Sequence, residues 1–368
     1  TNGAYPNIWH PAVRDLAQTN ITALARFCRE RVPNLMLYDK VTWEPAFEGA
    51  RIDKVGVRLA GYSPQAVTAF RTYLREKFGT VERLNEAWKT QYPGFGSIGP
   101  APDPFAEPRT WVTPHHHEFE RFRSNSYAEW LKDCVNALRT ADPGRPVAAQ
   151  VVTVNANFAW AMADPFGLIR QLPVEYIEDH YNKWPGAFPN LRMLYSLCLY
   201  ADRHPIEMEY IWTYPRDRDP VGEDQFRVTG ELGFWRRLVW GRKALHVFGW
   251  FDGWGYRHNY MDERFCELGV TLGPTGHFVR EAATCLPLSK KRAREYWEIL
   301  TRTDVIEPRV AALLPTPSMI NAFPYWSPYK GYGASVSEIM RYEKLLVAED
   351  IDYRVVPEAV VLSGTEDL

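Results

Sequence analysis

Short apolar runs alternate with helix-like segments along this chain, and this alternation limits the folds it can adopt more than any other feature. Apolar runs as long as buried strands lie at 34–39, 147–154, 174–179, 206–211 and 244–251. Helix-like segments follow the later runs, at 165–171, 191–201, 224–241 and 262–286. Repeated strand–helix units of this kind form a parallel sheet covered by helices on both faces. We therefore predict an α/β fold with five parallel strands.

The number of strands narrows the choice among α/β folds. A closed (β/α)8 barrel has eight strands, so five strands indicate either an open sheet or a TIM-barrel-type fold that lacks strands 1–3 in this chain. A last packing helix and then a strand, a helix and a strand are expected at 289–300, 310–314, 335–349 and 353–356. We predict a barrel domain over 1–304 with a helical insertion at 60–115. The start of a flavodoxin-like α/β domain follows over 305–368.

Capping residues define several helices closely. A helical period covers 11–31, and Ser63 followed by Pro64 starts a helix that Gly79 ends. Thr80 caps a short helix over 81–88, and a long helix is expected at 118–140. Residues 48–59 show no clear period, so no element is predicted there.

Polar residues follow nearly all the predicted strands at the carboxyl end. They are Glu44, Asn155, Asp179, Tyr181, Glu209, Trp250 and Asp252. A single polar residue after a strand is ordinary loop chemistry. The same placement after five successive strands is what an active site at the mouth of a barrel requires.

Two of these residues, Glu44 and Glu209, form the pair of carboxylates that a glycosidase needs. Glu44 lies between Trp43 and Pro45, where desolvation favours the protonated acid, and Glu209 is the better nucleophile. Glu207 is its rival, because alternate residues of a strand share a face and periodicity cannot choose between them. A structural ion pair inside the barrel is the alternative for either carboxylate.

The aromatic content points to carbohydrate. The chain has 14 Trp, 20 Tyr and 18 Phe, and many tryptophans adjoin Gly, Pro or acidic residues, as a cleft for sugar rings requires. Core packing accounts for some of them. We expect Trp43, Asn155, Asp179, Tyr181, Trp212, Trp250 and Asp252 to bind substrate. The net charge of −2, without basic runs, argues against nucleic acid or an anionic membrane as partner, and the apolar stretches are too short to cross a bilayer.

Cysteine and histidine patterns give no metal site. Five scattered cysteines without a CxxC motif are typical of a protein in a reducing compartment. They favour a cytoplasmic location weakly. The run His115–His117 is followed by Glu118, but Arg121 stands where an HExxH zinc motif needs its second histidine. We therefore expect a solvated helix start there, and neither metal nor cofactor.

Four segments carry a resemblance to a known family. The segment 70–98, FRTYLREKFGTVERLNEAWKTQYPGFGSI, resembles the helical insertion after strand 4 of glycoside hydrolase family 42, the β-galactosidase-like barrels of clan A. Segments 176–185, 207–209 and 230–250 are similar to later parts of that barrel. The resemblance implies Glu44 as acid/base, Glu209 as nucleophile, strands 1–3 before Thr1, and a trimer formed through the second domain.

The sequence departs from the family pattern at two places. Trp43 stands where the family usually has an asparagine that binds the sugar 2-hydroxyl, so the sugar specificity is open. The segment 61–66, GYSPQA, has no thiol where some members bind zinc, so no zinc is expected. We predict a retaining β-galactosidase-like glycoside hydrolase. The alternatives are a non-catalytic carbohydrate-binding relative of the barrel and a clan A glycanase of other sugar specificity.

Overall fold

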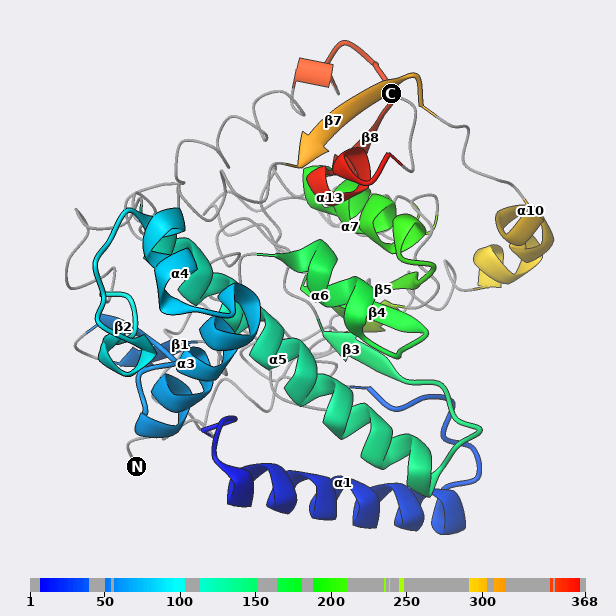
Figure 1. Cartoon of the computed structure of the whole chain (residues 1–368). Helices are drawn as coiled ribbons and strands as arrows, with labels where there is room; N and C mark the ends of the chain where they lie inside the picture. The colour runs from blue at the N-terminus through cyan, green and yellow to red at the C-terminus, as the bar shows by residue number, and fades with distance from the viewer. Residues whose placement is uncertain are drawn as a thin grey trace.

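The computed structural model describes residues 7–39, 50–53, 56–102, 113–150, 164–180, 188–210, 235, 238, 245–247, 291–302, 308–314, 345–346 and 348–364 (Figure 1). Helices and a central parallel sheet make up most of this part of the chain. Within it, no helix is long and apolar enough to cross a membrane.

Four parallel strands form the central sheet, in the order β3, β4, β5, β6. They are β3 (Ala148–Gln150), β4 (Tyr176–His180), β5 (His204–Tyr210) and β6 (Leu245–Val247). Tyr38 adds a fifth position, because it forms a parallel bridge with Val147 beside β3. The predicted strands therefore lie side by side in chain order, as in part of a (β/α)8 barrel.

The first predicted strand is much shorter than expected. The run at 34–39 was predicted to be buried, yet only Tyr38 pairs with a neighbour, and Met36 is 85% exposed. Within the described residues, this segment pairs with β-structure at Tyr38 alone. The exposed Met36 shows that no other segment covers its apolar run along the whole length.

Tyr38 is held by both its backbone and its side chain. Its N–H donates to the Pro146 carbonyl (2.9 Å), and its own carbonyl accepts from the Ala148 N–H (2.8 Å). The buried hydroxyl donates to Asp142 (2.9 Å) and also reaches the carbonyl of Ala25 (3.2 Å). Tyr38 therefore connects the first predicted strand to β3 and to the N-terminal helix that contains Ala25.

Arg145 completes this cluster. Its Nε donates to Asp142 (2.8 Å), its guanidinium lies 5.8 Å from the centre of the Tyr38 ring, and it also donates to the Leu35 carbonyl. The hydrogen bond from Arg145 lowers the pKa of Asp142. Burial, together with the bond to Asp142, raises the pKa of Tyr38 to about 12. Below that pH the hydroxyl keeps its proton and remains a donor.

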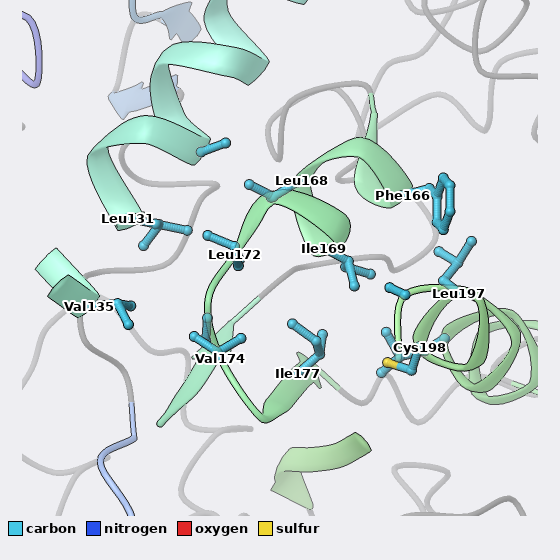
Figure 2. Packing of buried hydrophobic residues seen from close by; sticks show 14 of the residues in the cluster. Leu131, Val135, Phe166, Leu168, Ile169, Leu172, Val174, Ile177, Leu197 and Cys198 are labelled. Atoms are coloured by element: carbon cyan, nitrogen blue, oxygen red, sulfur yellow. The ribbon is translucent and has the colours of Figure 1, made fainter. Parts of the chain in front are cut away.

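Helices cover one face of the sheet and enclose the main core. The helix α1 (Pro11–Arg31) packs against the long helix α5 (Pro114–Ala141), and α6 (Pro165–Gln171) and α7 (Phe188–Tyr200) follow. Figure 2 shows Val174 and Ile177, from the segment that contains β4, facing apolar side chains of these helices. The shared core includes Leu131, Val135, Leu168, Ile169, Leu194 and Leu197.

The insertion between Tyr38 and α5 forms a helical unit with a core of its own. It contains α3 (Pro64–Phe78), α4 (Val81–Trp88) and the 3-10 turn Phe95–Ser97. The predicted caps are confirmed: Ser63 and Thr80 accept from backbone N–H groups, and Gly79 ends α3 with a φ of 73°.

A hairpin precedes these helices and was not predicted. Its strands β1 (Ala50–Asp53) and β2 (Gly56–Leu59) pair antiparallel. Each strand has only four residues, which is too short for a period of two to stand out in the sequence.

The C-terminal elements are α10 (Trp297–Arg302), β7 (Val310–Leu314), β8 (Tyr353–Pro357) and α13 (Glu358–Leu362). The strands β7 and β8 were predicted and pair in parallel. The helix α7 carries β8 directly: Arg192 contacts Asp352 (2.8 Å) and lies 4.3 Å from the centre of the Tyr353 ring, and Ser196 accepts from the Val355 N–H (3.1 Å). The domain division at 304/305 stays a prediction.

Removing the Tyr38 hydroxyl tests the importance of this cluster. Tyr38→Phe removes one of the two donors to the buried Asp142 carboxylate and leaves Arg145 as the other, so we expect unfolding in urea to show a loss of about 1–3 kcal/mol of stability. Tyr92→Phe is the matched control, because the Tyr92 ring contacts Trp88 while its hydroxyl has no hydrogen bond within the described residues. Equal stabilities of the two variants would contradict the role given to Tyr38.

Candidate active site

The carboxyl ends of the parallel strands meet at one edge of the sheet, where a barrel carries its active site. Three of the predicted site residues lie on described strands: Asp179 on β4, and Glu207 and Glu209 on β5. The others lie outside the described residues: Trp43, Glu44, Asn155, Tyr181, Trp212, Trp250 and Asp252.

The register places two acidic positions side by side. Asp179 on β4 is the partner of Glu207 on β5. On the other side of β5, Glu207 pairs with Leu245 and Tyr210 pairs with Val247, so β5 has one residue more than β6 between these pairs. This register shift, a β-bulge or a similar irregularity, lies between Glu207 and Tyr210. Glu209 therefore lies within the irregular stretch, whereas Glu207 is paired in register.

The inner face of the sheet carries two buried polar residues that the sequence analysis did not single out. Val147, Ala149 and Ile177 belong to the core shared with the helices. Gln150 and Glu178 alternate with them and so lie on the opposite face, with exposures of 3% and 0%. The signal in the sequence was available, because Glu178 follows Ile177 inside a predicted strand.

The first turns of α5 lie at the same edge as the strand ends. The helix α5 connects the strand at Tyr38 to β3, so it runs back across the sheet and begins near the strands' carboxyl ends. Thr113 caps it by accepting from the His116 N–H. Side chains in these turns therefore lie closer to the predicted site than the rest of α5.

The three histidines of this turn are not the solvated helix start that was predicted. His115 stacks between Phe70 and Trp88 and makes a 3.0 Å hydrogen bond with the Gly99 carbonyl, and His116 is 2% exposed. The insertion packs over the start of α5 and removes these rings from water. Burial lowers the pKa of all three imidazoles. No cluster of three or more potential metal ligands is found among the residues that the structure describes.

Acidic residues in the next turn of α5 are paired with cations. Glu118 accepts from Lys77 (2.7 Å) and from the Tyr73 hydroxyl (2.7 Å), which ties α3 to α5. Burial and this bond raise the pKa of Tyr73. Glu120 and Arg123 form a buried ion pair at 2.6 Å. Breaking such a pair would leave an uncompensated buried charge, which is strongly unfavourable. The intact pair therefore holds this end of α5 in place.

Part of the chain is similar to known proteins. Residues 46–183 match the sequence profile of glycoside hydrolase family 42, described as beta-galactosidase. A curated beta-galactosidase from Arthrobacter sp is 29% identical over 33% of this chain and 17% of its own length. One from Thermus thermophilus is 28% identical over 47% of this chain and 25% of its own length. Over residues 46–183 the chain is similar to glycoside hydrolase family 42.

A solved structure has the same fold as this chain. The crystal structure of a beta-galactosidase from Bacillus circulans sp. alkalophilus superposes with a TM-score of 0.68, at 18% identity, over 97% of this chain and 50% of that chain. The TIM-barrel-type fold predicted from the sequence is therefore confirmed. The chain spans about half the length of this solved structure.

The family 42 match contains the insertion but neither proposed catalytic residue. The segment 70–98, with its LNEAW motif, lies inside the matched range. Glu44 precedes that range and Glu209 follows it. The matched range therefore says nothing about the roles of these two residues.

The buried histidines predict a loss of stability in acid. Their pKa values in the folded chain lie below that of an unfolded histidine, about 6.5, so the unfolded state binds more protons as the pH falls below this value. Stability present above pH of about 6.5 should then decrease toward pH 5, as measured by urea unfolding. His116→Gln should flatten this dependence, whereas His204→Gln, at an exposed position, should not. An unchanged pH slope in His116→Gln would contradict the argument.

Proposed function

We propose that this family 42 relative is a retaining, β-galactosidase-like glycoside hydrolase. The observation that carries the proposal is the arrangement of the parallel strands. Tyr38 leads into the segment that holds Glu44, and β5, three strand positions further on, holds Glu209. The curated relatives from Arthrobacter and Thermus thermophilus are both named beta-galactosidase, which supports this choice over the other glycosidases.

The two carboxyl groups would act in two displacements. Glu44, protonated, donates its proton to the glycosidic oxygen while the Glu209 carboxylate attacks the anomeric carbon and the leaving alcohol departs. Glu44 then takes a proton from water, which attacks the same carbon and frees Glu209. Two inversions give net retention, and this route requires the carboxyl groups to lie about 5–5.5 Å apart.

The register shift in β5, of the kind that a β-bulge produces, supports Glu209 over Glu207 as the nucleophile. Glu207 pairs in register with both Asp179 and Leu245, within the regular part of the sheet. Glu209 lies in the irregular stretch before Tyr210. Bulges are frequent next to active sites, because they redirect a side chain that the regular strand would place elsewhere.

The anchored strand supports Glu44 as the acid/base. Five residues separate it from Tyr38, whose backbone and hydroxyl are both fixed. A catalytic group has to be held within a fraction of an ångström of its working position. A firmly held strand end shortly before Glu44 is a suitable support for it.

The proposed substrate is a carbohydrate with a terminal β-galactosyl unit. Asn155, Asp179, Tyr181, Trp212, Trp250 and Asp252 would bind it, with Trp43 next to the acid/base. We also propose that residues 305–368 are part of a second, trimerisation-like α/β domain and that the protein is a homotrimer, which sedimentation velocity measures directly.

Substitution of three glutamates tests the proposed mechanism. We expect Glu44→Gln and Glu209→Gln to lower kcat for an aryl β-galactoside by about 10²–10⁴-fold, because each removes a group that acts in the transition state. Glu207→Gln is the matched control and should retain most of the activity. Azide should restore turnover to Glu44→Ala and yield a β-azide, and ¹H NMR of the first-formed sugar should show the β-anomer. An α-anomer, or full activity of Glu209→Gln, would overturn the mechanism.

A further inference from the structure

The helix α1 carries a stripe of apolar residues on its exposed side. Leu16, Leu24 and Phe27 are 62%, 56% and 58% exposed, and Ala23 is exposed as well. Single apolar residues are ordinary on a protein surface, but a helix usually keeps polar residues on the side turned away from the core. Three large apolar side chains on one exposed helix side therefore indicate a surface that another protein surface covers.

This stripe is separate from the side of α1 that holds the helix in the fold. Ala25 is fully buried and Ile21 packs against the main core. Arg14 donates to Asp133 of α5 (2.7 Å), which fixes the helix to its neighbour. Figure 1 shows α1 along the lower margin of the molecule, with α5 above it. The apolar stripe thus remains available for a contact outside the fold.

The spacing along the stripe is that of a seam between two helices. Leu16, Asn20, Ala23 and Phe27 recur at intervals of four, three and four residues, as the a and d positions of a heptad do. The small Ala23 allows a second helix to approach closely. An asparagine at one such position is a known device for fixing the register of a helix pair. The 21 residues of α1 provide a seam of about 30 Å.

Two charged residues make this seam complementary to itself. Asp15 and Arg26 are both exposed, and they lie eleven residues apart, close to three turns, so they share one flank of the seam. A twofold axis between two antiparallel helices brings the same flank of each copy together, and every contact occurs twice. When Leu16 lies opposite Phe27 of the second copy, Asp15 lies within one turn of Arg26 of that copy. The apolar positions and the charges then match in the same arrangement.

We propose that α1 is a self-association surface through which two copies of this chain pair in antiparallel orientation. Specific interfaces bury about 1,200–2,000 Å² in total, and one pair of helices lies at the low end of this range. The dimer therefore dissociates on dilution. The inference does not rest on the glycosidase function. Combined with the trimer proposed above, a twofold contact of this kind joins two trimers into a hexamer.

The first experiment measures the mass of the whole chain by sedimentation velocity over a series of concentrations. Phe27→Glu places a charge in the seam, so we expect the dissociation constant of the twofold contact to rise at least about tenfold. The assembly should then have half the mass of the unsubstituted protein. Leu199→Glu is the matched control, because Leu199 lies on α7 and is 64% exposed. It should leave the mass unchanged.

A second experiment tests the orientation of the two helices. Asp15→Arg and Arg26→Asp each place like charges opposite one another, so each should weaken the twofold contact by about fivefold. The double variant Asp15→Arg with Arg26→Asp restores opposite charges across the seam and should regain the affinity of the unsubstituted chain. This rescue is expected only if the two residues meet between antiparallel copies.

Three results would overturn the proposal. The first is an unsubstituted chain without the twofold contact at any concentration, which would mean that a different partner covers the stripe. The second is an equal mass of the unsubstituted chain and Phe27→Glu. The third is a double charge variant no tighter than either single one. Each is independent of the catalytic mechanism, which the activities of Glu44→Gln and Glu209→Gln test separately.

Discussion

The hydrogen bonds of Tyr38 connect parts of the chain that are otherwise far apart in sequence. Its backbone pairs with Pro146 and Ala148, its hydroxyl reaches Ala25 and Asp142, and Arg145 holds Asp142 in place. Bonds to a charged partner contribute more than neutral ones, about 1.5–3 kcal/mol each. They join α1, the start of the sheet and the end of α5 into one unit, so the geometry of the strand that leads to Glu44 depends on them.

Local chemistry made several elements predictable. The helix α3 begins after Ser63 and ends before Gly79 because the cap and the left-handed turn act within a few residues. The same is true of α4 after Thr80, and of β7 and β8, whose apolar runs are short and well bounded. The order of the parallel strands also followed from the sequence, since right-handed strand–helix units place successive strands side by side.

Features that depend on distant segments could not be predicted. The exposure of Met36 depends on which segments pack against it, a fact about neighbours that a run of apolar residues does not contain. His116 is buried because the insertion packs over the start of α5. The sequence does not show this, since three histidines in a row are typical of a solvent-exposed segment. From the sequence, the site could be placed only at one end of the parallel strands. The register shift between Glu207 and Tyr210 and the inward position of Gln150 depend on how neighbouring strands pair, which the sequence alone does not give.

The C-terminal strands, which the sequence assigns to a second domain, pack against a helix of the barrel. Tyr353 and Val355 of β8 belong to the same apolar core as Leu197 of α7, and Arg192 of α7 both pairs with Asp352 and covers the Tyr353 ring. Apolar surface of this kind contributes about 25 cal/mol for each Å² removed from water. The C-terminal strands therefore stabilise a helix of the barrel, and α7 leads directly into β5, which carries Glu209. Support for the proposed nucleophile thus extends into the part of the chain that the sequence assigns to a second domain.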